Sequence, residues 1–220
     1  MTTLITYAGQ GAPGAAVTRI GGVPLAVPGT AWPTCADCAG PLKFLAQFLL
    51  DESGSALAGG GRRPAHAHVL ALFACQNRPG TCQDWNASSG ANAALLLPAR
   101  GLRRMARPRG RAVDSEKLLL GATHAAEPHT ADEAGYEGAC AAWAARTGRP
   151  RNHVLGQLGG TPAWLQYDQT PACPTCVEPM RLAVQLQEGP DPLTAMNFGT
   201  GRAYAFTCAP CGEAAFLWQC

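Results

Sequence analysis

The chain has 220 residues, a formal net charge of +2 at neutral pH and a hydrophobic content of 47%. The balanced charge gives no overall sign of a nucleic-acid or membrane-surface protein, and the sequence contains no run of 18 apolar residues of the kind that crosses a bilayer. The 26 glycines and 18 prolines favour a turn-rich protein with short strands over one with long helices.

We expect residues 1–18 to form a flexible N-terminus, because they are small and lack the basic and apolar regions of a secretory signal. A chain without an export signal is expected in the cytoplasm, where thiols stay reduced. The ten cysteines of this chain are therefore expected to be reduced thiols, eight of which are predicted to bind metal.

Residues 19–99 are predicted to form a first repeat, in which apolar strands join two cysteine pairs. The first pair forms a Cys-x-x-Cys motif, and a buried strand is expected directly after it over residues 42–50. A second apolar run leads to the second pair, whose members are separated by six residues, and another short strand is expected over residues 93–97. The four cysteines of this first set are Cys35, Cys38, Cys75 and Cys82.

Residues 100–152 are expected to form an arginine-rich loop and a connecting helix. Six arginines lie within residues 100–111 with no acidic residue among them, a pattern that favours either contact with RNA or an acidic protein, or a solvated basic loop. Thr130 and Glu133 match a capping box, which predicts a helix N-terminus there, and Gly148 is predicted to end the helix. Its apolar stripe consists of Tyr136, Ala139, Cys140, Trp143 and Ala144.

Residues 153–220 are predicted to form a second repeat, because the outline of residues 21–47 returns 138 residues later. Two glycines, two prolines, a Cys-x-x-Cys motif and a later glutamine all keep this offset without a gap, which is typical of a duplicated unit. A second Cys-x-x-Cys motif follows after 31 residues. The four cysteines of this second set are Cys173, Cys176, Cys208 and Cys211.

Each set of four cysteines is typical of a tetrahedral zinc site, in which thiolates from two turns converge on one ion. The pattern is stronger in the second set, because both of its pairs have the usual ligand spacing. Disulfide bonds are the alternative for both sets, but the expected reducing compartment favours zinc. We therefore expect two structural Zn²⁺ ions, each with four sulfur ligands and no open position for catalysis.

The segments 155–166, 181–186 and 196–206 resemble the C-terminal half of the YwqG-like bacterial family. Residues 35–42 and 158–165 are also similar to the zinc-binding domain of the programmed cell death protein 2 group. The resemblance implies an α+β, β-rich and internally duplicated fold of two lobes with a zinc knuckle on each lobe. It also implies a chaperone-like role, and it carries over no catalytic residue.

The expected function is that of a cytosolic zinc-stabilised module that binds a protein client or partner without catalysis, in a chaperone-like or toxin-immunity-like role. The alternative from another class is an enzyme with its site in the cleft between the lobes, where His124, His129 and His153 would converge on a carboxylate such as Asp132 or Glu133. RNA binding through the arginine-rich loop is a third interpretation, less favoured because no aromatic residues interleave with the arginines. No membrane partner is expected.

Overall fold

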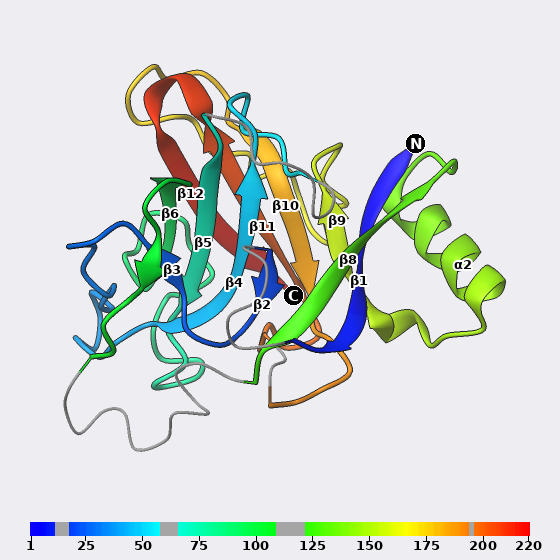
Figure 1. Ribbon diagram of the computed structural model, residues 1–220, viewed down its shortest axis with the longest axis horizontal. Helices are drawn as coiled ribbons and strands as arrows, with labels where there is room; N and C mark the ends of the chain where they lie inside the picture. The colour runs from blue at the N-terminus through cyan, green and yellow to red at the C-terminus, as the bar shows by residue number, and fades with distance from the viewer. Residues whose placement is uncertain (12–17, 58–65, 109–121, 194–195) are drawn as a thin grey trace.

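The structure is a computed structural model that describes residues 1–11, 18–57, 66–108, 122–193 and 196–220. Its main feature is one ten-stranded antiparallel sheet with the order β12-β11-β10-β9-β1-β8-β2-β4-β5-β6 (Figure 1). A separate two-stranded sheet pairs β3 (Leu25–Ala26) with β7 (Arg103–Arg104). The strands of the large sheet are β1 (Thr2–Gln10), β2 (Arg19–Ile20), β4 (Lys43–Leu50), β5 (His68–Ala74), β6 (Asn92–Pro98), β8 (His124–Ala131), β9 (Val154–Leu158), β10 (Arg181–Gln187), β11 (Arg202–Cys208) and β12 (Glu213–Gln219).

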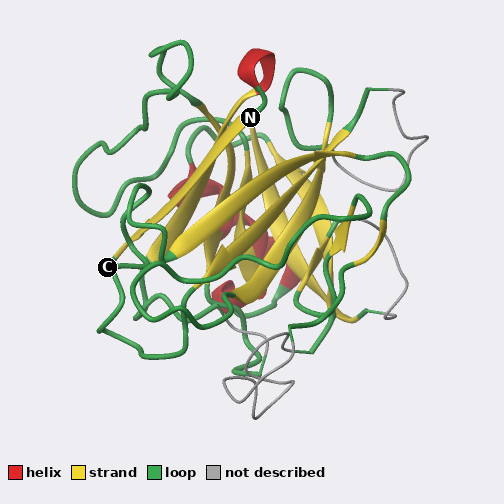
Figure 2. Ribbon diagram, turned by 90° about the vertical axis from the view of Figure 1, so that its left-hand side faces the viewer, coloured by secondary structure: helices red, strands yellow, loops and turns green. Residues whose placement is uncertain are grey.

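The large sheet curls until its two edge strands, β6 and β12, pack beside each other (Figure 1). At this seam the backbone N–H of Trp218 donates to the carbonyl of Trp85 at 3.2 Å. Figure 2 shows the strands crossing the centre of the molecule, with loops gathered around them. The sheet is therefore nearly closed.

The prediction of an α+β fold with two lobes is wrong. The largest apolar cluster takes buried residues from both parts of the chain, among them Phe48 of β4, Leu72 of β5, Val184 of β10 and Phe216 of β12. All eight residues of β4 are buried, including the polar Lys43 and Gln47, so the strand is covered on both faces of the curled sheet. Because one core is shared, the two parts cannot form separate lobes.

Strand β1 lies in the middle of the sheet and joins its two halves. It pairs with β8 on one side, where Leu4 is opposite His129, and with β9 on the other, where Leu4 is opposite Gln157. These residues belong to the segment that the sequence led us to expect as a flexible terminus; residues 12–17 of that segment lie outside the described part. The alternation of Leu4 and Ile5 buries one side chain in each of two apolar clusters.

The helix α2 (Tyr136–Thr147) packs against β1 and β8, at the right of Figure 1. Its predicted apolar stripe is largely confirmed, since the helix buries Tyr136, Ala139, Cys140 and Trp143. The predicted capping box is wrong: Thr130 belongs to β8, and the N-cap is Gly135 without a side-chain cap. Gly148 ends the helix in the left-handed conformation, as predicted. No helix in the described part of the chain is long and apolar enough to cross a membrane.

Several contacts around β4 and β10 recur in the two halves of the sheet at the offset of 138 residues. Moving outward from the β1–β8 pair, the strands follow the orders β2-β4-β5-β6 and β9-β10-β11-β12. β4 and β10 each contain a register shift, between Phe44 and Ala46 in one and between Leu182 and Val184 in the other. Four equivalent hydrogen bonds, all 2.8 Å long, run from Gly21 N to Leu45 O, Gly159 N to Ala183 O, Leu25 N to Gln47 Oε1 and Ala163 N to Gln185 Oε1.

Candidate metal centres

The structure brings the four cysteines of each predicted set together. Within each set the Sγ atoms all lie within 4.8 Å of one another, and such a group can hold a metal ion. We call Cys35, Cys38, Cys75 and Cys82 cluster 1, and Cys173, Cys176, Cys208 and Cys211 cluster 2.

The spacing of the sulfur atoms fits tetrahedral coordination. The Sγ atoms of Cys38 and Cys75 are 3.7 Å apart, and those of Cys176 and Cys208 are also 3.7 Å apart. Four thiolates at about 2.3 Å from a zinc ion are separated by about 3.8 Å from each other. All ten cysteines are free thiols, so the disulfide alternative is not realised in this structure.

Both Cys-x-x-Cys motifs form the same tight turn. Its ends are held by a bridge between Thr34 and Pro41 in cluster 1, and by a bridge between Ala172 and Pro179 in cluster 2. Inside the turn, the backbone N–H of the residue after the second cysteine donates to the carbonyl of the first cysteine, at 2.8 Å in one turn and 2.9 Å in the other. This geometry needs a left-handed residue, and the two positions are occupied by Ala39 and Val177.

In cluster 1 the thiols differ in their tendency to ionise. Burial alone would raise the pKa of Cys38, but hydrogen bonds from the Gly40 backbone and the Asn77 side chain outweigh it and lower the pKa to about 7. Burial raises the pKa of Cys75 to about 11 and also raises the pKa of Cys82. Without a cation, negative charge is therefore favoured on one sulfur and opposed on its neighbours.

Cluster 2 has the same pattern. Burial alone would raise the pKa of Cys173, but hydrogen bonds from the backbone N–H groups of Cys176 and Thr175 outweigh it and lower the pKa to about 7. The pKa of Cys211 is raised to about 12, because its thiol is hydrogen-bonded to the sulfurs of Cys176 and Cys208. A divalent cation would offset the repulsion that several adjacent thiolates create.

A loop covers cluster 1. The connection between Cys75 and β6 passes over the first Cys-x-x-Cys turn, where the carbonyl of Gly90 accepts a hydrogen bond from Ala36 N at 3.0 Å. The backbone N–H of Gln83 donates to Asp37 Oδ2 at 2.8 Å and so ties the same loop to the turn. Three of the four cysteines of cluster 1 are consequently no more than 2% exposed.

Asn77 is a candidate functional residue that the sequence did not reveal. Its Nδ2 atom lies 3.5 Å from Cys38 Sγ and 3.4 Å from Cys75 Sγ, and it donates to the carbonyl of Pro41 at 3.1 Å. A side chain at Gly40 would come within 2.6 Å of this amide, so the glycine makes room for it. The only sequence signal was its position two residues after Cys75.

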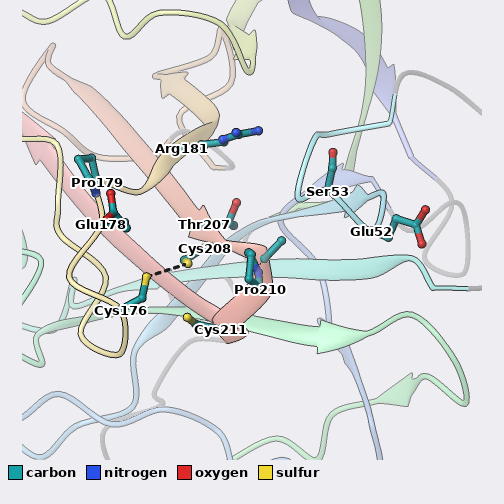
Figure 3. Close-up of a pocket in the computed structure, with 11 residues that line it drawn as sticks. Glu52, Ser53, Cys176, Glu178, Pro179, Arg181, Thr207, Cys208, Pro210 and Cys211 are labelled. Carbon is teal, nitrogen blue, oxygen red and sulfur yellow. Dashed lines mark hydrogen bonds between the residues drawn. The ribbon is translucent and has the colours of Figure 1, made fainter.

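No loop in the described part of the chain passes over cluster 2 as the loop before β6 passes over cluster 1. A 3-10 turn, Ala209–Cys211, and Gly212 are all that separate Cys208 from β12. Cys176 is exposed, and Cys208 and Cys211 are half-buried. Figure 3 shows a pocket of about 630 Å³ that opens over these three cysteines.

The histidines proposed for an enzyme site do not converge on the proposed carboxylates. His124 is buried and its Nε2 lies 2.9 Å from Asp191 Oδ2, whereas His129 Nε2 lies 2.8 Å from Arg146 Nη2. His153 Nδ1 lies 2.9 Å from Arg149 Nη2. Of the proposed carboxylates, Glu133 faces the same Arg146 at 3.8 Å rather than a histidine.

The arginine-rich segment is described only in part. Arg103 and Arg104 form β7 and are exposed, and the side chain of Arg103 donates to the carbonyl of its neighbour Leu102. Residues 109–121, which include Arg109 and Arg111, lie outside the described part of the chain. The prediction of RNA contact through this segment stays a prediction.

Part of this chain is similar to a known bacterial protein. No family model matches the chain. A segment of 66 residues, 30% of this chain, is 36% identical to the uncharacterized protein YpfL of Salmonella typhimurium. The chain spans only 15% of that relative's length. The resemblance to a YwqG-like protein is therefore not confirmed.

Proposed function

We propose that this chain is a zinc-stabilised protein-binding module that works in a reducing compartment and has no catalytic role. The observation that carries the proposal is the presence of two closed sets of four cysteines. Four thiolates fill the tetrahedral positions of zinc and leave none for a substrate or a reactive water. Closed sites of this kind hold a fold together.

Each zinc ion would join a tight turn to the ends of two neighbouring strands. In cluster 2, for example, the ion would link the turn at Cys173 and Cys176 to the β11–β12 hairpin at Cys208 and Cys211. A structural zinc site contributes on the order of 10 kcal/mol to folding, as much as the net stability of a typical domain. Metal binding would thus keep the loops of this end of the sheet in one conformation.

A group of exposed apolar side chains beside the β6–β12 seam supports protein binding. Tyr167 is 67% exposed, Trp85 43% and Leu165 42%. The backbones of all three residues are held at the end of β12. The side chain of Gln219 bonds the backbone of Leu165 and of Tyr167, and the backbone N–H of Trp218 donates to the carbonyl of Trp85. We infer that this surface binds an apolar segment of a protein partner.

The proposed origin, relatives, location and partner of the chain rest mainly on its sequence. We propose that the two halves arose by duplication, supported by the equivalent hydrogen bonds and register shifts, and that the chain is a distant relative of the YwqG-like proteins. We further propose a cytoplasmic location, and a partner that is either a client for chaperoning or a toxin.

Measurement of the zinc content per chain tests whether the two sets of four cysteines bind metal. Protein purified without added metal should contain two zinc ions per chain, and ten thiols should titrate after chelation and denaturation. One zinc would restrict the proposal to a single cluster. No zinc together with few free thiols would overturn it in favour of a disulfide-bonded chain.

Site-specific crosslinking tests the binding surface. A photo-reactive residue at Tyr167 should give one defined adduct in cells, and the same group at the exposed Glu127 on β8 should not. The adduct should disappear when Leu165→Ser is added. An adduct that forms equally from both positions would contradict a specific surface.

A further inference from the structure

The pocket above cluster 2 is formed by parts of the chain that are far apart in the sequence. Ser53, in the loop after β4, lies across from the second Cys-x-x-Cys turn, and Thr207 and Pro210 lie between them (Figure 3). The floor of the pocket contains Cys176, Cys208 and Cys211, so a molecule in it would lie directly over the sulfur ligands.

The loop that forms one wall is held in place by its own hydrogen bonds. The Oδ1 atom of Asp51 accepts from the backbone N–H groups of Ser53 and Ser55, at 2.8 and 2.9 Å. Gly54 has a positive φ of 81°, and a side chain there would come within 2.8 Å of Thr207 Oγ1. The wall therefore packs closely on β11, and the pocket is preformed.

The side chain of Arg181, at the edge of this pocket, has no hydrogen-bond or ion-pair partner among the described residues. It is exposed, and Figure 3 shows it extending above the cysteines. The pocket is lined by two acidic residues, Glu52 and Glu178, and by one basic residue, Arg181. The guanidinium of Arg181 is suited to hold a carboxylate through two parallel hydrogen bonds. The equivalent residue 138 positions earlier is Lys43, which is only 8% exposed. The same position beside cluster 1 therefore offers no accessible cation.

We propose that this pocket admits a small carboxylate ligand, held by Arg181, and that through it cluster 2 exchanges its metal ion while cluster 1 keeps its own. This inference rests on the proposed binding of zinc by both clusters. The exposed Cys176 would be the first thiolate that a donor atom of the ligand replaces, and it would take up a proton from water as it is released. Replacement of the remaining sulfurs would transfer the metal to the ligand.

Chelators of different charge test the proposal on the zinc-loaded protein. EDTA is a polyanion that carries carboxylates, whereas TPEN is a neutral chelator. Zinc release should occur in two phases, each of one equivalent, and rapid alkylation followed by mass spectrometry should show the cysteines of cluster 2 modified in the fast phase. Equal rates of release from the two clusters would overturn the proposal.

The substitution Arg181→Gln isolates the role of the guanidinium. It should slow the fast phase with EDTA by about two- to fivefold, the range expected for one exposed charge, and leave the rate with TPEN unchanged. A variant that loosened the fold would release metal faster to both chelators. Arg78→Gln removes the same charge from the loop between Cys75 and Cys82 and should leave the fast phase as it is. An Arg181→Gln effect of the same size with both chelators would contradict the proposed ligand site, whereas protein without bound zinc would overturn the proposed function itself.

Discussion

Clusters 1 and 2 each contain a Cys-x-x-Cys turn of the same geometry, but the chain segments around the two turns differ. In cluster 1 the connection to β6 passes back over the turn and bonds to Ala36 and Asp37. In cluster 2 the connection to β12 is a single 3-10 turn followed by Gly212, and the sulfurs face a pocket of about 630 Å³. The same ligand geometry can thus be a buried part of the core or an accessible site, depending on one connection. The length of a loop, and not the motif, decides which.

The largest expected effect is on the free energy of unfolding, and it should differ between the two clusters. Cys82→Ser should lower the free energy of unfolding by at least about 4 kcal/mol, because a structural zinc site contributes on the order of 10 kcal/mol and Cys82 is 1% exposed. Cys211→Ser should cost about half as much or less, since the short turn still closes the β11–β12 hairpin. Chemical denaturation and metal analysis measure both.

The exposed Cys220 provides the control, and Cys220→Ser should leave stability and metal content unchanged. If Cys211→Ser proved as damaging as Cys82→Ser, the contrast between a buried and an accessible cluster would be lost.

A smaller effect is expected at Asn77. Asn77→Ala removes the amide that contacts Cys38 Sγ and Cys75 Sγ, so it should weaken metal binding at cluster 1 by about ten- to a hundredfold. Competition titrations with a chelator should show this loss at cluster 1 alone. Asn86→Ala, in the same covering loop but bonded to Ser88, should not change the affinity. An equal loss in both variants would mean that the amide acts by ordering the loop.

The smallest effect is expected at the two residues with left-handed backbone conformation in the cysteine turns, Ala39 and Val177. Val177 has a φ of 66° and is β-branched, and a branched side chain is disfavoured there. Val177→Gly should therefore raise the free energy of unfolding by about 0.5–1 kcal/mol, after the entropy of glycine is subtracted. Ala39→Gly at the equivalent position should give less, and thermal unfolding would distinguish them. Destabilisation by Val177→Gly would show that the exposed valine makes a favourable contact.

The sequence predicted the local features of the molecule well and its long-range arrangement poorly. The cysteine turns, the strand that became β4 and the end of α2 at Gly148 depend on residues close together in the chain. The joining of the two halves through β1 depends on pairing with residues more than 110 positions away, and no motif in Thr2–Gln10 marks it. A repeated pattern was therefore interpreted as two lobes, although the repeats share one core.

At the candidate metal centres the limits were similar. The eight cysteines followed from their spacing, but the covering loop, Asn77 and the pocket did not. Arg181 was visible in the sequence only as the first residue of a strand. Its importance depends on Ser53 and its neighbours, which come from the other half of the chain.

The central position of β1 has a consequence for the order in which the protein folds. The hairpins of each half connect strands that are near in sequence, so they can form soon after synthesis and bind metal early. β1 is made first but has no sheet partner until β8 and β9 exist. We expect its insertion to be the late and slow step, and until then the exposed edges of β8 and β9 are open to pairing with another chain.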